Sequence, residues 1–460
     1  MTPIDTAILL SVILIILVFL GVRVAFATAL VGFVGLFLTF AIEKNLGIEK
    51  GFLIAAKIAG QIPHAKVSSY ELALIPIFVL IGFLAYYAGL TTALFSAAKK
   101  WLGWLPGGLA VATIFSSAGF SAVSGASTAT SAVFARIAIP EMLQLNYDKR
   151  LAAGVVAVGG TLAALIPPSA ILVIYAIIVE ASVGKLLLAA IVPGIFSALV
   201  YAVLIVVMAT FNKKLGPPVK GFTWAERIRS IPGTLPIFAV IMIVFFCIYF
   251  GWGTATEAGA LGGFVVFVIA VRKRMRWPDL NGALTETAKL TTMIFAMIWG
   301  VMIFVRYLGF AGLPDVFASW VAGLDQSPML TLIMILMAYV VIGMFMDAIG
   351  MMILTLPITF PAVIALNGGL NVTAEASAFG MTAIECGIWF GIVVVKMAEI
   401  CLVTPPIGLN CFVVAGARSD LTVQDVFKGV VPFFLSDGLT IAVLIGFPGI
   451  VLWLPRLIVS

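Results

Sequence analysis

Charged residues are scarce in this chain. They make up 10% of the 460 residues, whereas 63% are hydrophobic and the mean hydropathy is +1.23. A soluble domain carries about 25% charged residues, so this composition excludes a soluble protein with a single anchor and predicts an integral membrane protein. Because a spanning helix needs about 20 apolar residues, the chain has room for on the order of a dozen spans plus hairpins.

Histidine is nearly absent and cysteine is rare. The single histidine, His64, lies in a polar segment between Glu43 and Tyr70 that we expect to be a loop or an interfacial helix. The cysteines, which form no CxxC pair, are Cys247, Cys386, Cys401 and Cys411. This pattern suggests no zinc site, no obvious disulfide and no histidine-dependent catalysis. No basic residue precedes the first apolar run, so we expect that run to be retained rather than cleaved as a signal peptide.

Acidic residues are outnumbered by basic ones, which gives a net charge of +6. Two basic stretches, at 213–229 and 272–276, bracket a pair of apolar runs. Lysine and arginine concentrate in cytoplasmic loops, so we expect both stretches on the cytoplasmic side. No basic stretch is interleaved with exposed aromatic residues, and we expect no nucleic-acid partner.

Two long apolar runs are interrupted by proline pairs, at Pro167-Pro168 and Pro405-Pro406. Proline lacks an amide donor and clashes with the preceding turn, so each pair should break a helix. Lipid cannot satisfy the backbone groups that a break exposes, so a break has to be buried in protein or line a watery cavity. Paired breaks indicate the binding site of a transporter. The alternative is two kinked helices with a structural role, since proline is common in membrane helices.

A segment rich in small and hydroxyl residues, 116–128, precedes the first break and favours a re-entrant hairpin over a simple packing role. Aligning Pro167 with Pro405, and Pro140 with Pro361, gives a weak internal repeat with a polar insertion after Asn367. Nested inverted repeats are typical of alternating-access transporters. We therefore predict an all-α polytopic membrane protein with inverted repeats, two re-entrant helical hairpins and two broken transmembrane helices.

The breaks are candidate binding sites because unwound carbonyls and hydroxyls suit a monovalent cation, and half-helix N-termini suit an anion. The first candidate site combines Ser121, Ser124, Gly125, Ser127 and Thr128 with Thr161, Ala163, Ile166, Pro168 and Ser169. The second combines Gly343 and Asp347 with Cys401, Thr404, Pro405, Pro406, Ile407, Gly408 and Asn410.

Two charged positions in apolar surroundings are of interest. Asp347 is costly in hydrocarbon and indicates a cation, proton or substrate contact; the alternative is a helix cap at the mouth of a hairpin. Lys396 and Glu399 share one helical face, and we expect them to neutralise each other as a structural pair rather than to act as a proton relay.

The motifs resemble a known family. In this order, the Ser124-Gly125-Ala126-Ser127 turn, the Gly160 to Ser169 break and the Thr404 to Asn410 break resemble the large membrane subunit of the tripartite ATP-independent periplasmic (TRAP) transporters. The resemblance covers nearly the whole chain. It implies sodium-driven uptake of a small organic acid anion, a carboxylate or sulfonate, across the bacterial inner membrane by an elevator movement. It implies neither enzymatic activity nor a cofactor other than sodium as the coupling ion.

The resemblance also implies partners: a periplasmic substrate-binding protein, and a small four-helix membrane subunit that we expect as a separate chain. Its sodium sites fall by position on two sets of residues, the first being Ser121, Ser124, Ala163, Ile166 and Pro168 and the second Gly343, Cys401, Thr404 and Ile407. Ala163 stands where the family usually has glycine, a change that a backbone oxygen would survive. We expect substrate contacts from Gly125, Ser127, Thr128, Ser169, Asp347 and Asn410.

The repeat predicts five regions. They are N-terminal scaffold spans at 1–100, the first half of a transport domain at 101–182, linking scaffold spans at 183–325, its second half at 326–420 and a C-terminal span at 421–460.

Two alternative functions stay open at this point. A divalent-anion/sodium symporter of the two-hairpin elevator type would work without a binding protein. An intramembrane hydrolase is the other. Its serine form needs a Gly-x-Ser-Gly-type site and a membrane histidine, but Ala122-Val123 precedes Ser124. Its aspartyl form needs a second membrane aspartate beside Asp347, which we do not expect.

Overall fold

The computed structural model describes residues 2–67, 70–324, 326–406, 408–418 and 420–458. Within these ranges every regular element is a helix and none is a strand, which confirms the predicted all-α class. Capping boxes begin several helices, because a threonine hydroxyl and an acidic side chain three residues later each accept from the other's backbone amide. Thr254 with Glu257 and Thr382 with Glu385 are two of them.

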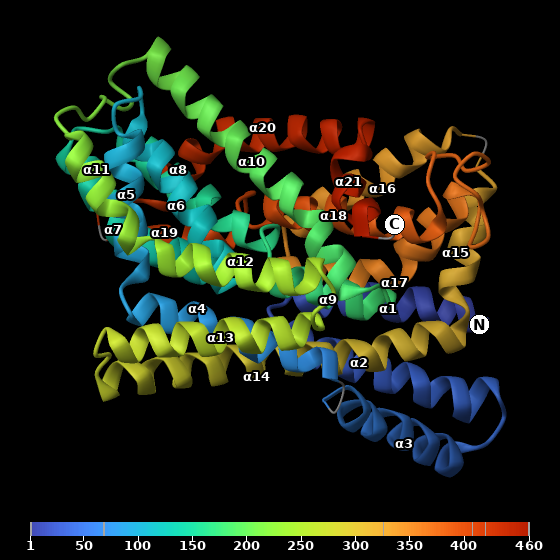
Figure 1. Cartoon of the computed structure of the whole chain (residues 1–460). Coiled ribbons are helices and arrows are strands. Elements are labelled where there is room, and N and C mark those ends of the chain that lie inside the picture. Colours follow the sequence, from blue (N-terminus) through green and yellow to red (C-terminus); the bar gives the residue numbers. More distant parts are fainter. Residues whose placement is uncertain (1, 68–69, 325, 407, 419, 459–460) are drawn as a thin grey trace.

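A central bundle contains the two breaks and their hairpins (Figure 1). Its first half consists of α6 (Gly108–Ser124), α7 (Ser127–Gln144), α8 (Lys149–Thr161), α9 (Ala170–Val179) and α10 (Val183–Phe211). Its second half consists of α16 (Pro328–Gly343), α17 (Ala348–Asn367), α18 (Ala383–Cys401), α19 (Leu409–Gly416) and α20 (Val423–Gly446), followed by α21 (Gly449–Ile458). Buried side chains from both halves belong to one continuous hydrophobic core.

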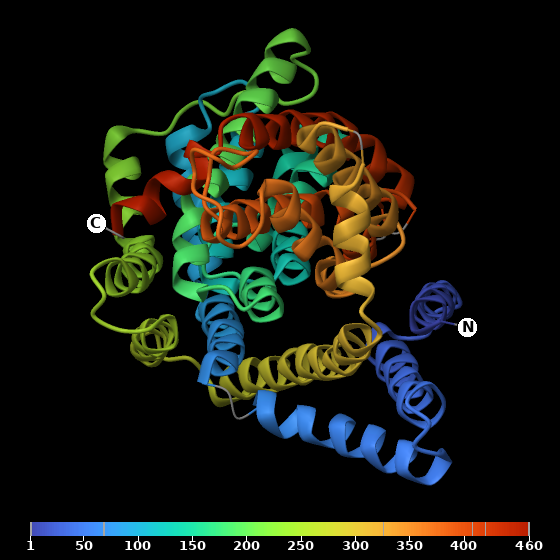
Figure 2. The ribbon, with the colours of Figure 1, turned by 90° about the vertical axis from the view of Figure 1, so that its right-hand side faces the viewer.

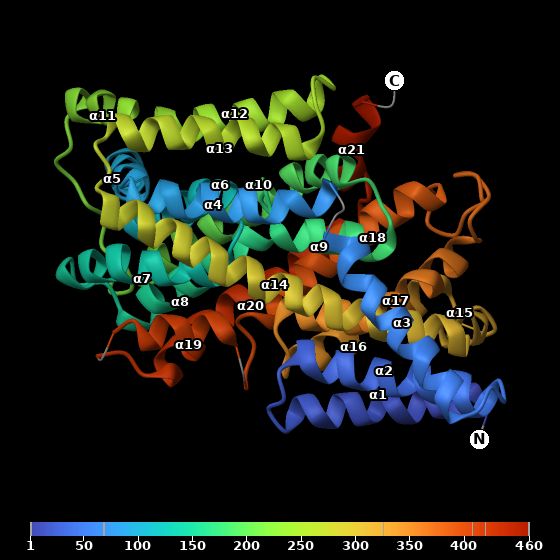
Figure 3. The ribbon, with the colours of Figure 1, turned by 90° about the horizontal axis from the view of Figure 1, so that it is seen from below.

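The other helices lie around this bundle. They are α1 (Pro3–Phe19), α2 (Val24–Leu38), α3 (Ile48–Val67), α4 (Leu74–Tyr87), α5 (Leu90–Leu102), α11 (Trp224–Ser230), α12 (Leu235–Tyr249), α13 (Ala255–Arg272), α14 (Trp277–Ala311) and α15 (Leu313–Ala322). Figure 3 shows the long α14 running from the α12–α13 pair to the α1–α2 pair, and it packs on both α4 and α2. Figure 2 shows α3 outside α14, away from the bundle. The polar segment at 43–70 is therefore largely helical.

Six helices of the described chain are long and apolar enough to cross a membrane, or eight if each of two bent pairs counts as one span. They are α2 with the turn that follows it, α10, α13, α14, α17 and α20. This is fewer than the dozen allowed by length, because α6, α9 and α16 belong to hairpins or broken helices and are shorter. The last predicted span is also two helices, since Phe447-Pro448 separates α20 from α21.

The two halves of the bundle repeat the same order of elements. A hairpin turn precedes α7 at Ala126 and α17 at Asp347, and each hairpin is followed by a helix that ends at a proline pair. Both proline pairs contain a cis peptide bond. The link between α7 and α8 covers 145–148, whereas the link between α17 and α18 covers 368–382. The polar insertion therefore lies where the sequence predicted it.

Candidate functional site

The first hairpin turn lies against the first break. Gly125 ends α6 with φ +59°, and its amide donates to the Ser121 carbonyl at 3.0 Å. A Cβ at Gly125 would lie 2.8 Å from the carbonyl oxygen of Pro168. Both the left-handed backbone and the lack of space require glycine here. The turn and the Pro168 carbonyl are thus in direct contact.

The first break presents oxygen atoms that no protein donor uses. Ser169 caps α9, accepting from the Leu172 amide at 3.3 Å and donating to the Ala164 carbonyl. Among the described residues, the carbonyls of Ile166 and Pro168 accept no hydrogen bond. The Ser121 hydroxyl is buried and has no partner there either. Free carbonyl and hydroxyl oxygens are suitable ligands for a monovalent cation.

The other predicted members of the first sodium set lie close to this break. Ala163 is in the short 3-10 turn Leu162–Ala164, which packs against α6. Ser124 is at the end of α6, and its hydroxyl is 3.0 Å from the hydroxyl of Thr130. The structure thus gathers this set around one hairpin turn and one break, and its role in sodium binding stays a prediction.

The second hairpin contacts the second break in a similar way. Gly343 ends α16 against Cys401, the last residue of α18, and a Cβ at Gly343 would lie 1.7 Å from the Cys401 sulfur. Thr404 follows in the break, where its hydroxyl donates to the Ile400 carbonyl at 2.6 Å. Its own carbonyl accepts no hydrogen bond from the described residues. Ile407, the fourth predicted member, lies outside the described residues.

Asn410 connects the two sites. It lies near the start of α19, fully buried, and its side-chain amide donates to the Ser127 hydroxyl at 2.9 Å and to the Ala157 carbonyl at 3.2 Å. Its Oδ1 is buried with no partner among the described residues. The helices of the two halves also pack against each other: α7 packs on α19, and α17 packs on α9. Each hairpin therefore contacts the helix that follows the break of the other half.

The remaining residues predicted to bind substrate lie at helix starts. Ser127 and Thr128 begin α7, and Ser169 caps α9. Asp347 caps α17, where its carboxylate accepts from the Gly350 amide at 3.3 Å. In the structure Asp347 is therefore a helix cap, which was the alternative interpretation of this residue. Contacts of these residues with a substrate stay a prediction.

A buried charge cluster lies behind the second break. The Lys396 ammonium is 2.6 Å from Glu399 on the same helix and 2.8 Å from Asp437 on α20. The Tyr201 hydroxyl, on α10, donates to Asp437 at 2.6 Å. All of these side chains are buried. The predicted Lys396–Glu399 pair is confirmed. Asp437 is a second buried aspartate, and its partners are Lys396 and Tyr201.

The link between the first hairpin and the first broken helix is anchored by polar contacts. The Tyr147 hydroxyl accepts from the Leu109 amide at 3.0 Å, and burial raises the pKa of Tyr147 to about 12. Lys149 pairs with Asp425 at 2.8 Å and thereby joins the start of α8 to α20. These contacts fix the helices that carry the first break.

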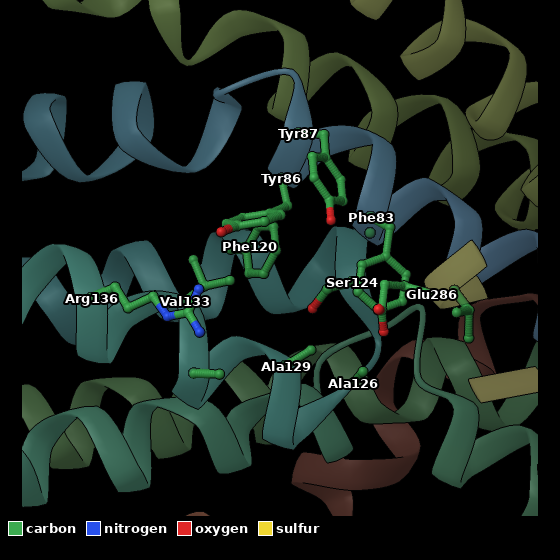
Figure 4. Close-up of a pocket in the computed structure, with 13 residues that line it drawn as sticks. Phe83, Tyr86, Tyr87, Phe120, Ser124, Ala126, Ala129, Val133, Arg136 and Glu286 are labelled. Atoms are coloured by element: carbon green, nitrogen blue, oxygen red, sulfur yellow. The ribbon is translucent and has the colours of Figure 1, made fainter. Parts of the chain in front are cut away.

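A cavity of about 290 Å³ lies beside the first hairpin turn, between α6 and α7 on one side and α4 and α14 on the other. Ser124 and Ala126 line it at the turn, and Phe83, Tyr86, Tyr87 and Phe120 supply aromatic walls. Arg136 and Glu286 also line it, and Figure 4 shows them on opposite sides with Ser124 between them.

Sequence reasoning missed three of these charged residues, Arg136, Glu286 and Asp437. Arg136 and Asp437 lie within apolar helices, where a charged residue indicates function or an internal partner. That signal was available for both. Nothing in the sequence placed Glu286 beside the hairpin turn, because the two are far apart in the chain.

Comparison with known proteins agrees with this architecture. Residues 11–450 match the family model described as the DctM component of the tripartite ATP-independent periplasmic transporters. Over 389 residues the chain is 32% identical to the C4-dicarboxylate TRAP transporter large permease protein DctM of Pseudomonas aeruginosa, covering 84% of this chain and 86% of that protein. It is 26% identical to the sialic acid TRAP transporter large permease protein SiaM of Vibrio cholerae, covering 96% of each.

Two further relatives are informative. The isethionate TRAP transporter permease protein DctMQ of Oleidesulfovibrio alaskensis is 29% identical, covering 88% of this chain and 62% of that protein. The crystal structure of the YdaH transporter of Alcanivorax borkumensis superposes with a TM-score of 0.54 at 13% identity, covering 82% of this chain and 85% of that one. That likeness concerns the fold alone. The chain belongs to the DctM component family of the TRAP transporters, and is a large permease subunit that crosses the bacterial inner membrane several times rather than an enzyme.

Proposed function

We propose that this subunit imports a small organic acid anion together with sodium, by an elevator movement of the bundle that carries the two breaks. One observation carries the proposal: each hairpin turn lies against a helix break, and the break presents carbonyl oxygens without hydrogen-bond donors among the described residues. Such oxygens can replace the hydration shell of a monovalent cation. Sodium bound at each contact would hold hairpin and broken helix together.

The arrangement of helices supports a moving bundle. The hairpins, the breaks and the buried Asn410 contact lie together in the bundle, and α1–α4 and α12–α14 lie around it, with buried side chains packed into the same continuous core. We infer that 101–182 and 326–420 move as one transport domain. The regions at 1–100 and 183–325 would form the scaffold apart from α10, which packs on α6, α18 and α20 of the bundle, and 421–460 follows the second half.

The partners follow from the family. Relatives are named as large permease proteins of TRAP transporters, and one is a permease protein named DctMQ. We propose that a periplasmic binding protein delivers the anion to this chain and that a small membrane subunit, as a separate polypeptide, braces its scaffold. Named substrates of relatives include C4-dicarboxylates, sialic acid and isethionate, which are all organic acids.

Uptake into vesicles tests the proposal. The complex would be reconstituted with an inward sodium gradient and with binding protein loaded with a radiolabelled acid. Accumulation is expected only when both the gradient and the binding protein are present. Uptake without the binding protein would favour a self-sufficient symporter, and uptake that follows a proton gradient instead would contradict sodium coupling.

A further inference from the structure

The cavity beside the first hairpin turn is lined by a cationic side chain, Arg136, that has no partner among the described residues. Arg136 lines the cavity from α7, and among the described residues it makes no ion pair and no hydrogen bond. Two other cationic side chains of this region are engaged: Lys99 pairs with Glu141, and Lys149 pairs with Asp425. A guanidinium presents a planar fork of donors that matches a carboxylate or a sulfonate. Arg136 is thus available to an anion that enters the cavity.

Glu286 lines the cavity on the side opposite Arg136. It projects from α14, and its one ion pair is with Lys289 at 3.5 Å, a residue that is 68% exposed and does not line the cavity. In Figure 4, Glu286 and Arg136 are separated by the Ser124 hydroxyl. A carboxylate accepts hydrogen bonds and repels a second anion. This end therefore favours a hydroxyl or ammonium group and disfavours an acid.

The walls and size of the cavity limit what fits between these ends. Tyr86, Tyr87, Phe83 and Phe120 line its sides, so an extended carbon chain would be held against aromatic rings. The volume of about 290 Å³ is at the lower end of the roughly 300–1,000 Å³ of small-molecule pockets. Ala126 caps α7 and Ala129 and Arg136 lie on it, and the ten helical steps from 126 to 136 extend over about 15 Å. The cavity thus suits a short, extended molecule.

We propose that this cavity binds a small organic monoacid whose acid group contacts Arg136 and whose far end carries hydroxyl or amino donors that face Glu286. The proposal rests on the proposed function and names the substrate class of the transporter. Unsubstituted dicarboxylates are poor ligands, because their second carboxylate would face Glu286. The Ser124 hydroxyl, at the hairpin turn, lies where the bound molecule would touch the first break.

Three acids of six carbons test this selectivity on the full-length chain in lipid nanodiscs. Gluconate has one carboxylate and a hydroxylated chain, hexanoate lacks the hydroxyls, and adipate carries a carboxylate at each end. Binding would be followed by the shift of the thermal unfolding midpoint with ligand concentration, in the presence of sodium. We expect gluconate to bind most tightly and adipate at least about tenfold more weakly, since a like charge at close range opposes it.

Substitutions at Arg136 and Glu286 test which group of the ligand each end of the cavity binds. Arg136→Gln should weaken gluconate binding about tenfold or more, and Arg136→Lys should retain part of it, because lysine keeps the charge but not the fork. Glu286→Gln should remove most of the discrimination against adipate. Arg272→Gln, at an exposed arginine of α13 outside the cavity, is the matched control and should change nothing.

Several results would overturn the proposal. They are equal binding of the three acids, tightest binding of adipate, no binding of any acid, or unchanged gluconate binding in Arg136→Gln. Stabilisation by sodium, measured on the same samples without acid, reports separately on the proposed coupling ion. A sodium effect without acid selectivity would reject only this cavity. Acid selectivity without a sodium effect would reject only sodium coupling.

Discussion

The side-chain amide of Asn410, on the second broken helix, donates to the hydroxyl of Ser127 at the start of the first hairpin, across 2.9 Å. The two residues come from opposite halves of the chain, and both are buried. This hydrogen bond joins the first hairpin to the second broken helix, so we expect occupancy of one candidate sodium site to influence the other.

Replacing Asn410 tests that connection. Asn410→Ala leaves the buried Ser127 hydroxyl without this donor, whereas the Ala157 carbonyl still accepts from the Ser131 hydroxyl at 3.5 Å. A buried unsatisfied group costs about 1–3 kcal/mol. We expect a lower thermal midpoint in detergent and a weaker response to sodium. Asn371→Ala, in an exposed loop, is the control. Equal stability of the two variants would show that the connection contributes nothing.

Gly125 offers a test of the first site. Gly125→Ala adds a Cβ at 2.8 Å from the Pro168 oxygen, besides the roughly 1–2 kcal/mol that a left-handed alanine costs. Gly89 has a similar φ of +68° with no atom within 4 Å of its Cβ position, so Gly89→Ala isolates the backbone cost. We expect both variants to be less stable, and Gly125→Ala alone to raise the sodium concentration at half-saturation. The same sodium response in both would argue against a site at this turn.

A matched pair tests the second site. Gly343→Ala forces a Cβ into the Cys401 side chain and should destabilise the protein by about 1–3 kcal/mol through overpacking. Cys401→Gly should rescue it more fully than Cys401→Ala, because the Cys401 Cβ itself lies 2.7 Å from the added atom. Gly309→Ala, on α14 with open space around it, should be neutral. If neither Cys401→Gly nor Cys401→Ala restored stability, the Gly343–Cys401 contact would not be the reason that alanine destabilises position 343.

The Lys396 cluster should behave as a structural unit. Lys396→Met leaves the buried carboxylates of Glu399 and Asp437 without their cation, and breaking a buried pair costs about 3–5 kcal/mol. The triple variant Lys396→Met, Glu399→Gln, Asp437→Asn removes all three charges and should recover much of the stability. Arg276→Met, at the exposed Arg276–Asp279 pair, should have no measurable effect. A triple variant as unstable as the single one would contradict this assignment.

Much of the fold could be predicted from the sequence, because proline pairs and small-residue turns act locally. The break at Pro167-Pro168, the hairpin turn at Gly125 and the insertion after Asn367 are each visible in a short stretch of residues. The contact between Asn410 and Ser127 depends on how helices of opposite halves cross, which no local pattern encodes. The cavity also escaped prediction, since α4, α14 and the first hairpin meet there only in the folded bundle.

Sodium binding at the breaks can be measured through the thermal unfolding midpoint of the purified protein in detergent. Sodium would be titrated against potassium at constant ionic strength. A ligand at about 100 times its dissociation constant adds roughly 2.7 kcal/mol to the folded state. We expect a saturable, sodium-selective rise that is reduced in Gly125→Ala and Gly343→Ala but kept in Gly89→Ala. Equal midpoints in sodium and potassium at every concentration would contradict it.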